Sequence, residues 1–207
     1  FPCACTRREL ADSAIAPDGA AIYPGTCRRG LPTGREARAW RVAVADARVS
    51  FDDAIQGRIV SDLATEAGDF ILRRADGLFA YQLAVVVDDA EAGITHVVRG
   101  ADLLASTSRQ IFLQQCLGVP TPSYAHLPVA IDAAGEKLSK QTRAAPVNIS
   151  RPVPALFAAL DFLGQRPPQE LSGAAVHELW AWARANWRLD QVPRGPKLFG
   201  CDNQADT

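Results

Sequence analysis

Residues 68–118 read GDFILRRADGLFAYQLAVVVDDAEAGITHVVRGADLLASTSRQIFLQQCLG. This stretch predicts an alternation of strands and helices. Residues 69–81 predict a short strand, a turn and a return strand, because their Asp-Gly pair is a strong hairpin signal. Residues 81–93 are apolar almost throughout and end in glycine, which predicts a buried helix. A short strand is expected at 95–100, and a helix with hydroxyl N-cap candidates at 106–118. This alternation indicates an α/β fold.

The apolar pattern on either side extends this organisation. Between residues 40 and 51 apolar residues alternate with others, the period of half-buried strands, so we expect a hairpin-like pair there. Apolar residues recur at helical spacing in 153–163 and again in 176–187. Both of these segments are therefore predicted to be amphipathic packing helices.

The composition is that of an ordinary globular protein. The 207 residues are 48% hydrophobic and 22% charged, which is enough to build a core and argues against disorder. A net charge of -1 means that any RNA binding must be local. No apolar run is long enough to cross a membrane, so no membrane partner is expected. Three of the five cysteines lie in the first 27 residues, which suits metal binding in a reducing compartment and predicts a cytoplasmic protein.

Four residues near the N-terminus could form a tetrahedral metal site: Cys3, Cys5, Tyr23 and Cys27. Two cysteines two apart in an extended segment project to the same side, and Tyr23 and Cys27 return after a loop that contains Gly and Pro. Three thiolates suit Zn²⁺, and a bound dication favours the phenolate form of tyrosine. The alternative is reduced cysteines without metal, and spacing does not decide between the two. Four protein ligands would make a single ion structural, because no coordination position stays open.

A second group of residues could bind a small acid and a polyphosphate. In "KLSK", Lys137 and Lys140 could close on phosphates, although short lysine pairs most often lie on solvated loops. Tyr81 opens the apolar helix, and Arg99 ends a short strand, where a parallel strand would face a ligand crevice. A phenol and a guanidinium could hold a carboxylate there. The alternative is an interfacial tyrosine and a surface arginine paired with Asp102.

Two histidines, His96 and His126, are expected to be structural, because the sequence positions no acidic or nucleophilic partner beside them. The adjacent Asp88 and Asp89 could bind a cation, but such a pair is more often a solvated helix end. Neither feature therefore adds a further catalytic group.

Taken together, these motifs resemble a known family. Residues 68–118, followed by "YAHLPVAIDAAGEKLSKQ" at 124–141, resemble the catalytic domain of bacterial glutamyl-tRNA synthetases, which are class I enzymes. The early "CAC" and "YPGTC" resemble the zinc module of the glutamyl-queuosine tRNA(Asp) synthetase family. The loop also carries Gln141 where glutamyl-tRNA synthetases usually have arginine, and no anticodon-binding domain is expected in the segment after it.

The resemblance implies the fold and the organisation of the chain. We expect the C-terminal portion of a class I aminoacyl-tRNA synthetase Rossmann-like catalytic domain, with a small zinc-binding insertion and C-terminal helices. Residues 1–38 would form the zinc-binding module, 39–148 the second part of the catalytic domain with the KLSK loop, and 149–207 a helical region and tail. The family's first strand and its HIGH-like signature would precede Phe1, so the chain by itself is expected to be inactive.

The resemblance also implies the activity. It would be ATP-dependent activation of L-glutamate, with Mg²⁺, and transfer of the glutamate to queuosine in the anticodon of tRNA(Asp), by a monomer. Tyr81 and Arg99 would contact glutamate, Lys140 would contact ATP with support from Lys137, and the four N-terminal residues would bind one structural Zn²⁺. The alternatives are a truncated glutamyl-tRNA synthetase and a non-catalytic, zinc-stabilised tRNA-binding module. Five arginines beside the zinc module are candidates for RNA phosphate contacts, with ordinary solvated side chains as the alternative: Arg28, Arg29, Arg35, Arg38 and Arg41.

Overall fold

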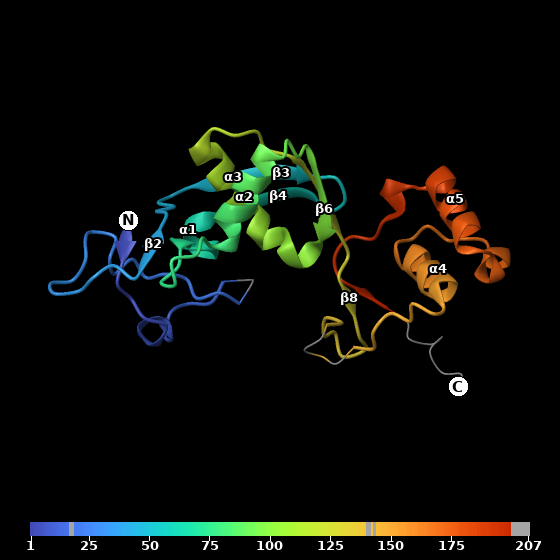
Figure 1. The fold of residues 1–207 in the computed structure, drawn as a ribbon, viewed down its shortest axis with the longest axis horizontal. Coiled ribbons are helices and arrows are strands. Elements are labelled where there is room, and N and C mark those ends of the chain that lie inside the picture. Colours follow the sequence, from blue (N-terminus) through green and yellow to red (C-terminus); the bar gives the residue numbers. More distant parts are fainter. Residues whose placement is uncertain (17–18, 140–141, 143, 200–207) are drawn as a thin grey trace. The chain divides into compact units, whose positions relative to one another are not determined.

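The computed structural model describes residues 1–16, 19–139, 142 and 144–199 (Figure 1). The chain forms two compact units. The first comprises Phe1–Asp53, Arg58–Val97 and Asp102–Tyr124, and the second comprises Ala54–Gly57, Val98–Ala101 and the chain from Ala125 onward. The three-part division expected from the sequence stays a prediction.

The first unit contains a three-stranded antiparallel sheet next to the cysteine-rich segment. Strand β1 (Pro2–Cys3) pairs with β2 (Ala39–Arg41), which pairs with β5 (Ile71–Arg73). After β5 the chain turns through Gly77, at φ 85°, and Phe79 returns to bridge Arg73. The predicted Asp-Gly turn is therefore confirmed, and it reverses the chain just before the first long helix.

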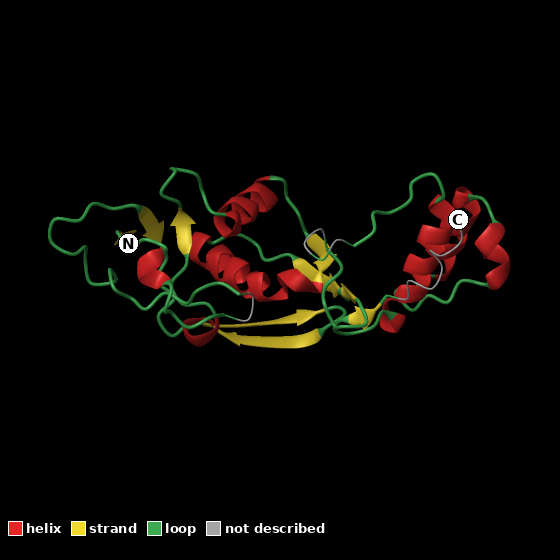
Figure 2. Cartoon of the chain, turned by 90° about the horizontal axis from the view of Figure 1, so that it is seen from below, coloured by secondary structure: helices red, strands yellow, loops and turns green. Residues whose placement is uncertain are grey.

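A four-stranded sheet and two helices form the α/β part of the fold. The strands are β4 (Gly57–Asp62), β3 (Arg48–Asp53), β7 (Ser123–Leu127) and β6 (His96–Gly100), in that order across the sheet. Strands β3 and β7 run parallel. Figure 2 shows the helices of this region on one side of the two long strands. They include α2 (Tyr81–Glu91) and α3 (Leu104–Leu117), so the predicted α/β class and both helices are confirmed.

The core of the first unit lies between these helices and strands. Its buried residues are Val44, Val49, Leu63, Ala67, Phe70, Val86, Ile111, Leu113 and Tyr124. Leu63 opens a short helix, α1 (Leu63–Glu66), whose first N–H groups are capped by the Asp62 carboxylate. Full burial of one such leucine or isoleucine side chain contributes about 1.5–3 kcal/mol.

The second unit contains the two expected packing helices and a short sheet. Helix α4 (Pro152–Phe162) begins with proline, which suits the first turn, where the missing N–H costs no hydrogen bond. It packs on α5 (Val176–Asn186) through a cluster of buried residues: Leu160, Leu179 and Ala183. Strands β8 (Ala130–Ile131) and β9 (Lys197–Leu198) pair in parallel. Both helix predictions are thus confirmed.

Two of the expectations about local structure are corrected by the strands and by α2. Residues 40–51 do not form a hairpin-like pair, because β2 and β3 join different sheets and Ala45, at φ 46°, lies in the turn between them. The helix at 81–93 is not buried on all sides, since Val86 is its one fully buried residue and Val87 is exposed. Within the part of the chain that the structure describes, no helix combines the length and apolar character that a membrane crossing needs.

Candidate functional site

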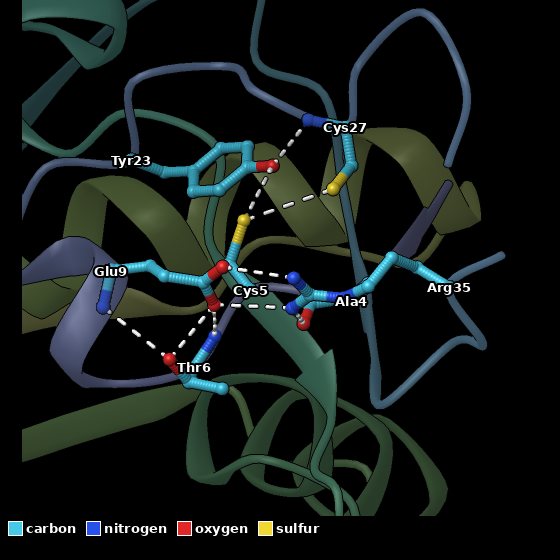
Figure 3. Close-up of polar contacts among 7 residues, drawn as sticks. All are labelled: Ala4, Cys5, Thr6, Glu9, Tyr23, Cys27 and Arg35. Atoms are coloured by element: carbon cyan, nitrogen blue, oxygen red, sulfur yellow. Dashed lines mark hydrogen bonds and ion pairs between the residues drawn. The ribbon is translucent and has the colours of Figure 1, made fainter. Parts of the chain in front are cut away.

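Three thiols and a phenol converge in the N-terminal segment, and Figure 3 shows the phenol of Tyr23 with two of the thiols, those of Cys5 and Cys27. The Tyr23 hydroxyl lies 3.6 Å from Cys3 Sγ and 3.7 Å from Cys5 Sγ, and Cys5 Sγ lies 3.7 Å from Cys27 Sγ. All three sulfurs lie within 4.8 Å of one another. Cys3, Tyr23 and Cys27 are buried. The structure therefore brings together the four residues that the sequence singled out.

The spacing of these donor atoms suits a tetrahedral metal ion. With metal–sulfur bonds of about 2.3 Å and a metal–oxygen bond of about 2.0 Å, a regular tetrahedron has S–S edges of about 3.8 Å and S–O edges of about 3.5 Å. Three of the six edges, the contacts of 3.6–3.7 Å, are close to these values, and all three sulfurs lie within 4.8 Å of one another. Three sulfur donors and one oxygen donor can hold a dication such as Zn²⁺ with only small shifts.

Backbone contacts hold three of these four residues in place. Cys3 is paired with Ala39 in the β1–β2 ladder, and the Cys27 N–H donates to the Tyr23 hydroxyl at 2.6 Å. Tyr23 also forms a bridge with Gly68, whose φ is 62°. A Cβ atom at position 68 would lie 2.8 Å from the Ile22 side chain and 3.0 Å from the Tyr23 nitrogen, so glycine is required there.

The environment changes the acidity of the donor groups. Burial raises the pKa of the Cys3 thiol, but hydrogen bonds from Tyr23 and Arg41 outweigh it and lower the pKa from 9.0 to about 7. Burial raises the pKa of Cys5. Burial, together with hydrogen bonds to Cys27 and Cys3, also raises the pKa of Tyr23. The phenol therefore keeps its proton in the metal-free protein and would lose it only to a bound cation.

A buried carboxylate connects this cluster to the core. Arg28 Nε donates to the Asp69 carboxylate at 2.7 Å, and the other oxygen of that carboxylate accepts from the Val44 N–H at 3.0 Å. Arg41 donates to the Asp69 carbonyl at 2.9 Å, and its guanidinium lies 4.0 Å from the centroid of the Tyr23 ring. Asp69 and its arginines thus join the cysteine cluster to the strands of the first unit.

These contacts correct one expectation about the arginines. Arg41 is buried and contacts Tyr23 and Asp69, so it is no candidate for RNA phosphates. Arg28 is engaged with Asp69, which leaves less of it available for an external anion. Arg29 and Arg38 are exposed and stay candidates.

The segment that follows Cys5 is stabilised by a surface network drawn in Figure 3. The Glu9 carboxylate accepts from the Thr6 N–H at 2.7 Å, the Thr6 hydroxyl at 2.8 Å and two Arg35 nitrogens at 3.0 and 3.2 Å. Arg35 also donates to the Ala4 carbonyl at 2.8 Å. The hydrogen bonds from Arg35, followed by those from Thr6, lower the pKa of Glu9 from 4.5 to about 2. Arg35 therefore stabilises the loop around the cysteines.

Tyr81, predicted to contact glutamate, is the first residue of α2 and is half exposed in the first unit. Its neighbour Gln82 donates to the Ser106 hydroxyl at 3.0 Å and accepts from the Gln110 amide at 2.8 Å. This network orients the beginning of α2 relative to α3.

Sequence reasoning missed that α3 presents a buried polar face. Six polar residues of this helix are buried: Ser106, Thr107, Ser108, Arg109, Gln110 and Gln114. The hydroxyl groups were expected to cap the helix, but the helix begins earlier, at Leu104. The Ser108 hydroxyl instead donates to Ser61 at 2.8 Å, and the Gln114 amide donates to the Tyr124 hydroxyl at 3.0 Å. The burial of these polar side chains could not be predicted from the helix sequence, because Ser61 and Tyr124 lie on strands that are distant in the sequence.

Arg99, the second predicted glutamate contact, belongs to the second unit and lies at the end of β6. Its Nε donates to His126 Nε2 at 3.1 Å. His126 is completely buried, whereas His96 is exposed and contacts the Thr95 hydroxyl.

The KLSK loop follows β8. The Asp132 carboxylate accepts from the N–H groups of Ala134 and Glu136, both at 2.9 Å, and the chain returns so that Lys137 bridges Ile131. Lys137 is exposed, and its carbonyl accepts from the Thr142 hydroxyl at 3.0 Å. Lys140 lies outside the described residues, so its predicted ATP contact stays a prediction.

Comparison with known proteins places this arrangement in a wider group. A family model described as tRNA synthetases class I (E and Q), catalytic domain, matches residues 34–153. The chain is 65% identical over 194 residues to the glutamyl-Q tRNA(Asp) synthetase of Aromatoleum aromaticum, covering 94% of this chain and 61% of that protein. It is 59% identical over 196 residues to the protein of the same name from Dechloromonas aromatica, and the match covers 94% of this chain and 65% of that protein.

Solved structures show the same fold. A glutamate tRNA ligase from Elizabethkingia meningosepticum, in complex with its amino acid, superposes with a TM-score of 0.67 at 21% identity, over 96% of this chain and 47% of that one. Glutamate-tRNA synthetase from Elizabethkingia anophelis superposes with a TM-score of 0.59 at 25% identity, over 76% of this chain and 35% of that one. The chain thus spans less than two thirds of the length of the first two curated relatives named above.

Proposed function

The chain belongs to the class I tRNA synthetases of the glutamate and glutamine group, and we propose that it serves the ATP-dependent activation of L-glutamate and transfer of the glutamate to queuosine in the anticodon of tRNA(Asp). One observation carries this proposal. The chain is 65% identical, over 94% of its length, to a glutamyl-Q tRNA(Asp) synthetase. The chain spans 61% of the length of that relative, so we assign the activity to the whole enzyme.

The proposed reaction has two steps. A carboxylate oxygen of glutamate attacks the α-phosphorus of ATP, the bond to the bridging oxygen breaks, and pyrophosphate leaves. Mg²⁺ bound with the ATP would neutralise part of the phosphate charge. A hydroxyl of queuosine then attacks the activated carbonyl, loses its proton, and displaces AMP. Neither step needs a covalent enzyme intermediate, so the protein contributes positioning and stabilisation of charge.

The proposed roles of the site residues follow from their chemistry. Arg99 would take the glutamate carboxylate in a two-point contact, and Tyr81 would add a phenol hydrogen bond. Lys137 and Lys140 would stabilise the negative charge on the phosphates as pyrophosphate leaves. The exposed position of Lys137 on the hairpin after β8 is compatible with contact to a bound nucleotide.

We further propose that Cys3, Cys5, Tyr23 and Cys27 bind one Zn²⁺ ion. The donor spacing of 3.6–3.7 Å supports this assignment, and the lowered pKa of Cys3 favours its thiolate. When bound, the ion would supply a tetrahedral cross-link and no open coordination position, so its role would be structural. A monomeric state and a cytoplasmic location, where cysteines stay reduced, remain predictions.

The test uses the full-length enzyme with ATP and labelled glutamate. Three acceptors are compared: tRNA(Asp) with queuosine, tRNA(Asp) without it, and tRNA(Glu). We expect label only on the first. Label on tRNA(Glu) would indicate an ordinary glutamyl-tRNA synthetase, and binding of tRNA without any transfer would indicate a non-catalytic module.

Two substitutions then test the site. Arg99→Lys keeps the charge but loses the two-point geometry, so the KM for glutamate should rise by about tenfold or more. Lys140→Ala should lower kcat by about 10²-fold, as expected for loss of a contact that strengthens in the transition state. Arg184→Lys, on the exposed surface of α5, is the matched control and should change neither constant.

A further inference from the structure

Arg41 is a buried arginine beside the cysteine cluster. It is the last residue of β2 and is 7% exposed, and its Cζ lies over the Tyr23 ring, 4.0 Å from the ring centroid. Its Nη1 donates to the Asp69 carbonyl at 2.9 Å. Because burial of a charged group is costly unless its charge is compensated, a partner of opposite charge is expected nearby.

Within the described residues, no carboxylate is that partner. The Asp69 carboxylate receives Arg28 and the Val44 N–H, whereas Arg41 contacts only the neutral carbonyl of Asp69. The Nε of Arg41 is buried and has no hydrogen-bond partner among the residues that the structure describes. The position of Arg41 is therefore unfavourable unless the cluster that it faces carries negative charge.

The proposed metal site supplies this charge. Three thiolates and a phenolate carry more negative charge than one Zn²⁺ ion neutralises, so the loaded site is an anion. Three of its four residues, Cys3, Tyr23 and Cys27, are buried, so water screens this charge poorly. A guanidinium over the face of an aromatic ring is attracted by the π electrons of that ring. Arg41 is thus placed to balance the charge of the site.

Arg41 also limits the orientation of the Tyr23 ring. Its backbone is paired with Ile71 in the β2–β5 ladder, and its side chain is anchored on the Asp69 carbonyl. The Tyr23 hydroxyl lies 3.6 Å from Cys3 Sγ and 3.7 Å from Cys5 Sγ, so a small tilt of the ring would move the oxygen away from the sulfurs. A planar, anchored guanidinium over one face of the ring opposes such a tilt.

We propose that Arg41 is a positioning residue of this metal centre, which holds the Tyr23 ring and balances the negative charge of the donor atoms, and thereby raises the affinity for Zn²⁺. The inference rests on the metal site of the proposed function. It assigns to Arg41 no bond to the ion and no contact with glutamate, ATP or tRNA.

The test measures the Zn²⁺ affinity of the full-length enzyme by competition with a chromophoric chelator. Arg41→Gln removes the charge but keeps a hydrogen-bond donor, and Arg41→Lys keeps the charge but loses the planar guanidinium. Loss of a residue that supports metal ligands typically weakens binding by about 10–100-fold, which is the effect expected of Arg41→Gln. Arg41→Lys should recover part of this loss. Arg38→Gln, the same change at an exposed arginine of the same segment, should bind as tightly as wild type.

Cobalt spectroscopy separates this role from a purely structural one. At saturating Co²⁺ in place of Zn²⁺, the visible bands of the tetrahedral ion should shift in Arg41→Gln, because the Tyr23 ring is no longer held, and should stay unchanged in Arg38→Gln. Amide hydrogen exchange in α3 shows whether each variant is folded. If Arg41→Gln does not fold, Arg41→Met takes its place, because it removes the charge without burying another polar group.

Three results would each overturn the inference: a neutral variant that loses less than about tenfold in affinity, a lysine variant that binds no better than the neutral one, or cobalt bands identical to those of wild type. A wild-type enzyme that binds no Zn²⁺ would instead overturn the proposed metal site, before any variant is compared.

Discussion

The cysteine cluster and the helical core of the first unit are stabilised in different ways. The segment around the cluster contains little regular structure. The cluster has four buried residues, two of which are cysteines: Cys3, Ala4, Tyr23 and Cys27. The helical core buries nine residues, among them valine, leucine, isoleucine and aromatic side chains from α1, α2, α3 and the strands. The first region is stabilised by hydrogen bonds and ion pairs between polar side chains, and the second by apolar packing.

The difference shows how a short segment with few apolar residues can still keep a defined structure. A small region rarely buries enough surface to offset the entropy of ordering its backbone, so cross-links or a metal ion usually supply the difference. The cysteine cluster should therefore depend on the proposed Zn²⁺, whereas α3 should depend on the fit of its side chains. The following changes act on one of the two regions, or on the residue that joins them.

Loss of metal should have the largest effect. Binding of structural zinc contributes about 10–16 kcal/mol to the folding of small zinc-dependent modules, so Cys27→Ser should abolish binding and unfold residues 1–38. Metal analysis should fall from one ion per chain to none, and hydrogen exchange should rise in this segment while α3 stays protected. Cys116→Ser, at an exposed cysteine outside the cluster, is the control and should keep the metal. Full protection of residues 1–38 in metal-free protein would contradict the comparison.

A cavity in the helical core should have the next largest effect. Leu113 is 2% exposed, so Leu113→Ala should reduce the free energy of unfolding by about 2–5 kcal/mol through lost burial and an unfilled cavity. Urea denaturation measures this loss, and the metal content of the folded protein should not change. Leu117→Ala, at a half-exposed position on the same helix, should cost much less. Similar losses for the two variants would mean that α3 is not stabilised by its buried face.

Asp69 joins the two regions, and its substitution should have an intermediate effect. Asp69→Asn keeps the shape of the side chain but removes the charge that receives Arg28, and a hydrogen bond between charged groups contributes about 1.5–3 kcal/mol. Since Arg28 is half exposed, we expect a loss near the lower end of that range. Asp76→Asn, in an exposed pair with Arg74, should change stability little. Equal losses for both variants would show that Asp69 is not a link between the regions.

The Glu9–Arg35 pair should have the smallest effect, because both groups lie at the surface. The pKa of Glu9 in the folded chain is about 2, below its ordinary 4.5. The ionised carboxylate therefore stabilises the fold above pH 4.5, and this contribution is lost as the pH falls through about 2. Carboxyl ¹³C NMR should find Glu9 still ionised at about pH 3, where an unperturbed glutamate is mostly protonated. Arg35→Gln should move the titration back toward the ordinary value, and Arg29→Gln should not.

Local patterns predicted a large part of this fold. The apolar spacing in 153–163 and 176–187 located both C-terminal helices, because helical periodicity depends only on neighbours three or four residues apart. The Asp-Gly turn before α2 was predicted for the same reason, since its conformation is set by the two residues themselves. The spacing of Cys3 and Cys5 likewise indicated that their thiols share one side.

Other features depend on partners far away in the sequence. The alternation in 40–51 indicated strands but could not show that β2 and β3 join different sheets. The hydroxyl groups at the start of α3 were expected to cap the helix, although the partners of Ser106 and Ser108 are Gln82 and Ser61. Arg41 was counted among exposed arginines because nothing near it in the sequence predicts its burial over the Tyr23 ring.

The sequence by itself thus determined the α/β class, the positions of the helices and the set of donor residues at the N-terminus. Only the tertiary structure decided that the three thiols and the phenol converge, that Asp69 joins the cluster to the core, and that Arg99 donates to His126. The physical reason is one of range. Backbone preference and periodicity act over a few residues, whereas hydrogen bonds, ion pairs and metal ligation require that residues tens of positions apart are brought to within 4 Å by the packing of the whole unit.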